Sequence, residues 1–158
     1  MFNDPGKLFA AVADNAMFLL VCLAVFAGIF AVAVLLERLW LKPEKQSPAR
    51  RTAYVGIFAA IAAVLMYFEF PLPFAPGFYE LDFSEIPVLI CSFSMGPVAG
   101  VVCEFLKVVM KLLLKGTSTA FVGDLANFAV GCALILPASV VYFANKTKKG
   151  AILGMVVG

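Results

Sequence analysis

The stretch AMFLLVCLAVFAGIFAVAVLL (16–36) contains no charged side chain. A helix needs about 20 apolar residues to cross the hydrocarbon core of a membrane, and this stretch is long enough. A secretory signal peptide has a shorter apolar region, of about 7–15 residues, behind a positively charged start. Here Asp4 and Asp14 outweigh Lys7, and no A-x-A cleavage site ends the run. We therefore predict a transmembrane helix over 16–36.

The composition of the whole chain agrees with this prediction. Of 158 residues, 63% are hydrophobic and only 14% are charged, whereas soluble domains are about 45–50% apolar and about 25% charged. Without histidine there is no Ser-His-Asp triad and no imidazole metal site. A net charge of +2 offers no basic surface for nucleic acid. We expect a membrane protein that is not an enzyme and needs no metal or cofactor.

The four cysteines lie in apolar runs, and none has CxxC spacing. They therefore resemble small buried apolar residues more than a disulfide framework or a zinc site. These residues are Cys22, Cys91, Cys103 and Cys132.

Three further segments are apolar enough to be helices in a membrane, at 53–68, 86–103 and 125–143. Between the first two lies FEFPLPFAPGFYELDFSE (68–85), whose prolines predict a loop. The aromatic side chains of this loop are compatible with an interfacial belt or with a lid over a ligand. Both interpretations remain open from the residues alone.

The number of membrane crossings follows from two basic clusters, LKPEKQSPARR (41–51) and ANKTKKG (144–150). Both favour the cytoplasm, so an even number of crossings must separate them. If Gly96-Pro97 ends one helix and begins the next, four crossings result, and we favour this arrangement. In the alternative, a single kinked span leads into an interfacial amphipathic helix over 104–115, and only three crossings result.

Polar side chains near the predicted spans are candidates for function, because each is costly inside a bilayer. Glu104 and Lys107 are three residues apart and can neutralise one another on one helix face. Asp124 can cap the beginning of a helix. Asn127 then lies one turn inside, where it can either join two helices or bind a ligand with donors and acceptors on one edge.

The segment 53–68 also carries two small-xxx-small pairs, which permit close helix approach within or between proteins. They are Gly56/Ala60 and Ala59/Ala63. No Walker sequence or Gly-rich phosphate loop is present, so energy for any transport must come from a partner or an ion gradient.

Three stretches carry a family resemblance: LDFSEIPVLICSFSMGPVAGVVCEFLK (81–107), GTSTAFVGDLANFAVGCALILPASVVYF (116–143) and NKTKKGAILG (145–154). They resemble the riboflavin-specific substrate-binding subunit of energy-coupling factor transporters. The shared motifs are L-D-F-S-[DE]-I-P, G-P-x-A-G, G-[DE]-x-A-N-F and a lysine-rich turn ending in K-G. They run in order from about residue 51 to residue 158.

The resemblance implies an all-α bundle of six transmembrane helices in the cell membrane. Such a subunit binds the vitamin riboflavin from outside and delivers it by associating with a transmembrane coupling subunit and two cytoplasmic ATPases. It implies substrate contacts from Asn127, Asp124, Asp82 and Phe83. It also implies that small residues of the first core helix face the coupling subunit, namely Gly56, Ala59, Ala60 and Ala63.

The resemblance divides the chain into two parts. Residues 1–50 are an additional N-terminal transmembrane helix with a basic cytoplasmic linker. Residues 51–158 correspond to the first four core helices and the start of the fifth. The last segment, AILGMVVG (151–158), rises only about 12 Å as a helix, so we expect a longer natural protein. The alternatives are a related subunit for another vitamin, such as thiamine or folate, and a membrane scaffold without transport function.

Overall fold

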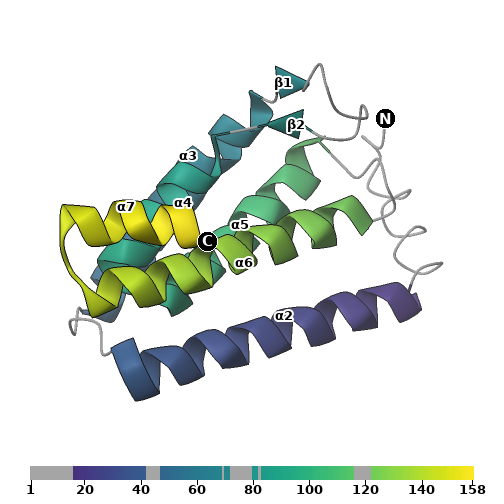
Figure 1. Ribbon diagram of the computed structural model, residues 1–158. Helices are drawn as coiled ribbons and strands as arrows, with labels where there is room; N and C mark the ends of the chain where they lie inside the picture. Colours follow the sequence, from purple (N-terminus) through teal and green to yellow (C-terminus); the bar gives the residue numbers. More distant parts are fainter. Residues whose placement is uncertain (1–15, 42–46, 69, 72–79, 82, 116–121) are drawn as a thin grey trace.

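The computed structural model describes residues 16–41, 47–68, 70–71, 80–81, 83–115 and 122–158. These residues confirm the predicted all-α class and form a bundle of helices with a small hairpin at one end (Figure 1). The helices are α2 (Ala16–Leu36), η1 (Glu37–Leu41), α3 (Pro48–Tyr67), α4 (Glu85–Met95), α5 (Pro97–Lys115), α6 (Val122–Ala144) and α7 (Lys148–Val157).

The hairpin lies inside the segment for which the sequence predicted a loop. Its strands are β1 (Phe70–Pro71) and β2 (Glu80–Leu81), paired antiparallel with Phe70 opposite Leu81. The residues between the strands, 72–79, lie outside the described part of the chain. Proline on a two-residue edge strand is permitted because such a strand has few ladder bonds to lose.

The chain breaks between α4 and α5 at Gly96, as the four-crossing arrangement requires. Gly96 has φ of 100°, a conformation that favours glycine, and Pro97 is the first residue of α5, where its missing N–H is not needed. The alternative of an interfacial helix over 104–115 is wrong. Residues 97–115 form one continuous helix, in which Glu104 and Lys107 are fully buried.

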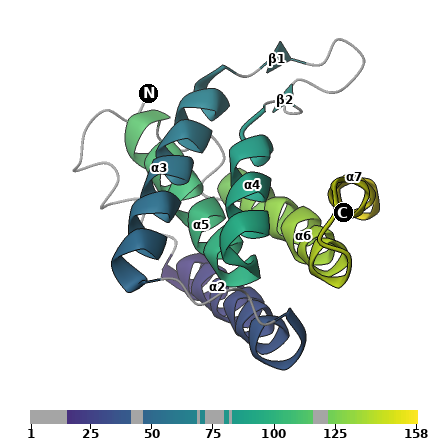
Figure 2. The same cartoon turned by 90° about the vertical axis from the view of Figure 1, so that its left-hand side faces the viewer.

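The additional helix α2 packs along α5 and α6, on the side of the bundle opposite the hairpin (Figures 1 and 2). Ala33 of α2 is buried in one cluster with Val101 and Cys132. Nearer the beginning of α2, the ring of Phe26 lies 4.3 Å from that of Phe105. Several other large side chains of α2 are exposed, as expected of a helix with one face on protein and the rest on lipid, among them Leu20, Leu23 and Leu35.

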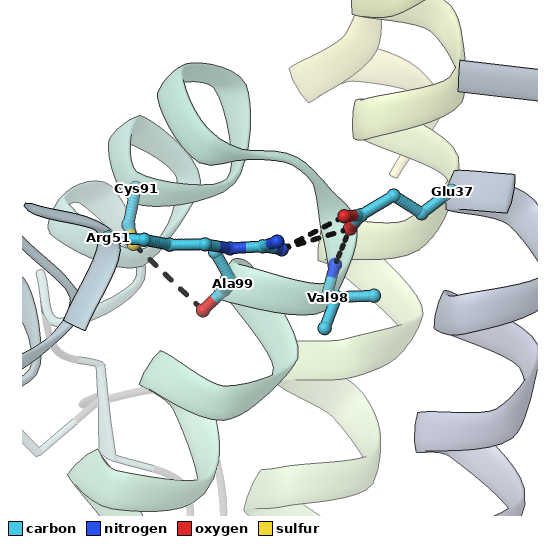
Figure 3. A network of polar contacts seen from close by, with 5 residues as sticks. All are labelled: Glu37, Arg51, Cys91, Val98 and Ala99. Carbon is cyan, nitrogen blue, oxygen red and sulfur yellow. Dashed lines mark hydrogen bonds and ion pairs between the residues drawn. The ribbon is translucent and has the colours of Figure 1, made fainter. Parts of the chain in front are cut away.

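A polar contact fixes the other end of α2 (Figure 3). Glu37 accepts hydrogen bonds from Nη2 of Arg51 at 3.0 and 3.2 Å, and from the backbone N–H of Val98 at 3.2 Å. Val98 lies in the first turn of α5, where N–H groups have no partner within the helix and the helix dipole favours a negative charge. One carboxylate therefore joins α2 to the beginnings of both α3 and α5.

Three helices in the described residues are long and apolar enough to span a membrane, over Leu20–Leu39, Pro48–Met66 and Gly123–Ala144. Helix α5 has 19 residues but carries charged side chains, and α4 has only 11. Glu104 and Lys107 of α5 are paired with each other inside the bundle, which is how a span can carry charged side chains.

The predicted topology has a direct test. In a variant without the native cysteines, we expect a cysteine at position 77 to react with a membrane-impermeant maleimide added to intact cells. A cysteine replacing Thr147 should react only after the cells are opened, because the basic cluster around it favours the cytoplasm. Reaction of both cysteines from the same side would contradict four crossings.

Candidate functional site

A buried ionic cluster occupies the bundle where α4 begins. The ammonium of Lys107 lies 2.6 Å from Oε1 of Glu85, 2.8 Å from Oε1 of Glu104 and 3.2 Å from Oγ of Ser84. Lys107 and Glu104 are fully buried, and Glu85 is partly buried. The predicted pairing of Glu104 with Lys107 is therefore confirmed. A buried charge must be paired in this way, since an isolated one is very costly.

A glycine on α6 makes room for this cluster. A Cβ atom placed on Gly131 would lie 2.5 Å from Oε1 of Glu104, which is closer than two non-bonded atoms can approach. The absence of a side chain at Gly131 therefore lets α6 pack directly over the carboxylate of α5. The same helix continues outward from this point to the predicted ligand residues.

Asn127 and Asp124 are three residues apart on α6 and point in neighbouring but different directions. At about 100° per residue, Asn127 is turned about 60° from Asp124, away from the direction of Leu125 and Phe128. Leu125, Phe128 and Asp124 line a cavity against α2, whereas Asn127 is not among its lining residues. Its Oδ1 atom is buried and has no hydrogen-bond partner among the described residues. This oxygen makes no hydrogen bond to another helix among the described residues, as a residue that joins helices would do. It can therefore accept a hydrogen bond from a ligand.

The other predicted substrate residues are arranged differently. Asp124 is buried, and its Oδ1 lies 3.7 Å from Nζ of Lys111. Phe83, just before α4, is 51% exposed and so lies at the surface of the described structure. Asp82 lies outside the described residues. The structure thus brings Asp124 and Asn127 to the same end of α6 but directs them to different surroundings.

The small residues of α3 divide between its inner and outer faces. Ala59 and Ala63 are 1% and 5% exposed, and Ala59 packs in the core with residues of α4 and α5. The chain itself covers both side chains, and a role for them at the coupling subunit stays a prediction. Ala60 is partly buried, whereas Gly56 is exposed and has nothing within 4 Å of the place where a Cβ would stand. The helical period of 3.6 residues accounts for the division.

Ser84 and Glu85 were not among the predicted site residues, although they complete the surroundings of Lys107. They precede Lys107 by 23 and 22 residues, and only the tertiary fold brings them to it. The one signal in the sequence is that Glu85 stands at the beginning of one helix and Lys107 lies on the next helix. The four cysteines form no disulfide. Cys91, Cys103 and Cys132 are buried as predicted, whereas Cys22 is only partly buried.

Comparison with known proteins identifies the fold. The family model for the ECF transporter, substrate-specific component, matches residues 50–158. The chain is similar to the riboflavin transporter RibU of Staphylococcus aureus (strain TCH60), with 34% identity over 108 residues, 68% of this chain and 56% of the relative. It is also similar to the riboflavin transporter FmnP of Bacillus subtilis (strain 168), with 32% identity over 110 residues, 69% of this chain and 58% of the relative.

A solved structure of the S component of a bacterial ECF transporter has the same fold, with a TM-score of 0.64 and 33% sequence identity. The similarity covers 70% of this chain and 65% of that chain. The present chain thus spans between half and two thirds of the length of these relatives. With its apolar helices and a family match over most of its length, this chain is a multi-pass cell-membrane protein that belongs to the substrate-specific components of ECF transporters.

Proposed function

We propose that this protein is the riboflavin-binding subunit of an ECF-type vitamin uptake transporter. It takes the vitamin from outside the cell and delivers it through a transmembrane coupling subunit driven by two cytoplasmic ATPases. The relatives with similar sequences are riboflavin transporters, which supports riboflavin over another vitamin. The chain itself holds no phosphate-binding loop, so the energy comes from its partners.

The observation that carries the proposal is the buried Oδ1 atom of Asn127, which has no hydrogen-bond partner among the described residues. An unpaired buried oxygen is costly unless a ligand pairs with it. The isoalloxazine ring of riboflavin is a flat apolar plate whose edge carries donors and acceptors. A site for such a ring needs apolar walls and a few placed polar groups, of which Asn127 is one.

The test is to purify the full-length protein from cells grown with riboflavin and to record the absorbance and fluorescence of the preparation. We expect flavin fluorescence that remains through gel filtration and is released when the protein is denatured. A colourless preparation that also fails to quench added riboflavin would contradict the proposal. Quenching of thiamine-derived thiochrome in its place would indicate another vitamin.

The exposed face of α3 is where we propose that the coupling subunit approaches. Gly56 lies on this face with open space around it, so Gly56→Trp should leave the fold intact but keep a partner helix at a distance. We expect this variant to lose riboflavin uptake in cells while the isolated subunit keeps its affinity for riboflavin.

Ala59→Trp is the matched comparison, one turn along the same helix. Ala59 is buried against α4 and α5, so a tryptophan there overfills the core by far more than one methylene group. We expect loss of both binding and uptake, with less folded protein recovered. If Gly56→Trp lowered binding as much as uptake, its face would not be a partner surface.

A further inference from the structure

A cavity lies against the side of α6 that carries Asp124, Leu125 and Phe128. It has a volume of about 210 Å³ and is enclosed by α2, α5 and α6. Nine of its ten lining residues are apolar, among them Phe26, Phe105 and Phe128, and the tenth is Asp124. The additional helix α2 forms a whole wall of this cavity. The residues that match the family model, 50–158, do not include that wall.

The cavity reaches the surface that lipids contact. Two of its lining residues, Leu23 on α2 and Phe105 on α5, are exposed. The α2 helix is apolar enough to span a membrane and packs along α5, so the open side between them faces hydrocarbon. The volume holds a segment of an acyl chain and is far too small for another helix, whose diameter with side chains is about 10 Å.

Among the described residues, Asp124 is the one polar side chain that lines this cavity. The Asp124 side chain is only 8% exposed, and its Oδ2 atom is buried without a hydrogen-bond partner among the described residues. On its other side, Oδ1 lies 3.7 Å from the ammonium of Lys111, a distance beyond a hydrogen bond. Asp124 therefore offers an acceptor that lacks a donor among the described residues, next to a partly exposed ammonium too distant to donate a hydrogen bond to it. A zwitterionic group with a primary ammonium and a phosphate matches both.

We propose that this cavity binds a zwitterionic phospholipid with a primary ammonium head group, such as phosphatidylethanolamine. One acyl chain fills the space between the rings of Phe26, Phe105 and Phe128. The ammonium donates to Oδ2 of Asp124, and the phosphate pairs with Lys111. The site is distinct from the proposed riboflavin contact, because Asn127 is not among the residues that line this cavity. The additional helix thereby gives this chain a lipid site that the matched region alone does not enclose.

Quenching of tryptophan fluorescence by brominated lipids tests this proposal in the whole protein. The single native tryptophan is removed by Trp40→Phe, and a reporter is placed in the cavity by Phe105→Trp. The protein is reconstituted into phosphatidylcholine vesicles that contain either dibrominated phosphatidylethanolamine or dibrominated phosphatidylglycerol with the same acyl chains. We expect dibrominated phosphatidylethanolamine to quench the reporter about two- to fivefold more effectively than dibrominated phosphatidylglycerol. A partly exposed ion pair can give a preference of this size.

The matched control is Val130→Trp. Val130 on α6 is 69% exposed. It lies at about the same membrane depth as Phe105, because the next residue, Gly131, adjoins Glu104, the residue before Phe105 on α5. We expect equal quenching by the two lipids there, as for a side chain that meets bulk lipid. In the cavity reporter, Asp124→Asn should abolish the preference.

Three results would overturn the proposal. The first is the same ratio of quenching by the two lipids at positions 105 and 130, which would mean that the cavity does not select a head group. The second is a preference that survives Asp124→Asn, and the third is a cavity reporter that neither lipid quenches. Leu23→Trp reports from the opposite wall, so the test remains decisive if Phe105→Trp does not fold.

Discussion

Replacing Lys107 by methionine should destabilise the protein more than any other single change to its ionic groups. Lys107 is fully buried with its ammonium between the carboxylates of Glu85 and Glu104. Lys107→Met keeps the length of the side chain but leaves two carboxylates facing each other without a cation. Removing one partner of a buried ion pair costs about 3–5 kcal/mol. For a protein of this size, that is a fall in Tm of roughly 6–20 °C, measurable by thermal unfolding in detergent.

Two further variants decide whether charge is the reason. Lys111→Met removes a lysine one turn along the same helix, but this lysine is partly exposed and lies 3.7 Å from its partner. It should cost less than Lys107→Met, because the contact with Asp124 is longer and Lys111 is partly exposed. Lys107→Met combined with Glu85→Gln and Glu104→Gln removes the unpaired charges and should recover much of the lost stability. Equal effects of Lys107→Met and Lys111→Met would contradict the account of the buried cluster.

The sequence predicted most of the helices because their causes are local. The charge-free run of α2, the break at Gly96-Pro97 and the prolines after α3 each act on neighbouring residues. The pairing of Glu104 with Lys107 was also local, since three residues on a helix lie side by side. What the sequence could not supply were contacts between distant segments. The bond from Glu37 to Arg51 and to Val98 joins three helices, and no pattern in any one of them indicates it.

The candidate site was predictable in its residue types but not in its directions. Asp124 and Asn127 were both expected near the substrate, yet a rotation of about 60° on α6 separates them. Which flank faces the ligand depends on where α2, α4 and α5 pack, and this is decided by tertiary structure. The same reason explains why the sequence could not show that Ala59 packs against helices of its own chain. Small residues permit close packing equally well inside a chain and between chains, so composition alone could not assign its partner.

The second large effect is expected at Asn127. Asn127→Leu keeps the volume of the side chain but leaves the polar edge of a bound flavin without its partner in a dry site. Such a loss costs about 1–3 kcal/mol, or roughly a 5- to 150-fold lower affinity for riboflavin. The measurement is titration of the full-length protein with riboflavin, followed by quenching of flavin fluorescence. Ala133→Leu, on an exposed position of the same helix, is the matched control and should bind as the unchanged protein does.

Stability without riboflavin separates a ligand contact from a structural one. In the free protein, Oδ1 of Asn127 is buried and unpaired among the described residues, so leucine removes a group that is costly to bury. Asn127→Leu should therefore leave the Tm of the free protein equal or raise it, while the increase in Tm on adding riboflavin becomes smaller. If Asn127 instead joins two helices, the variant unfolds at a lower temperature and binds riboflavin with unchanged affinity. That pair of results would remove Asn127 from the site, because a hydrogen bond between helices stabilises the fold whether or not the ligand is present.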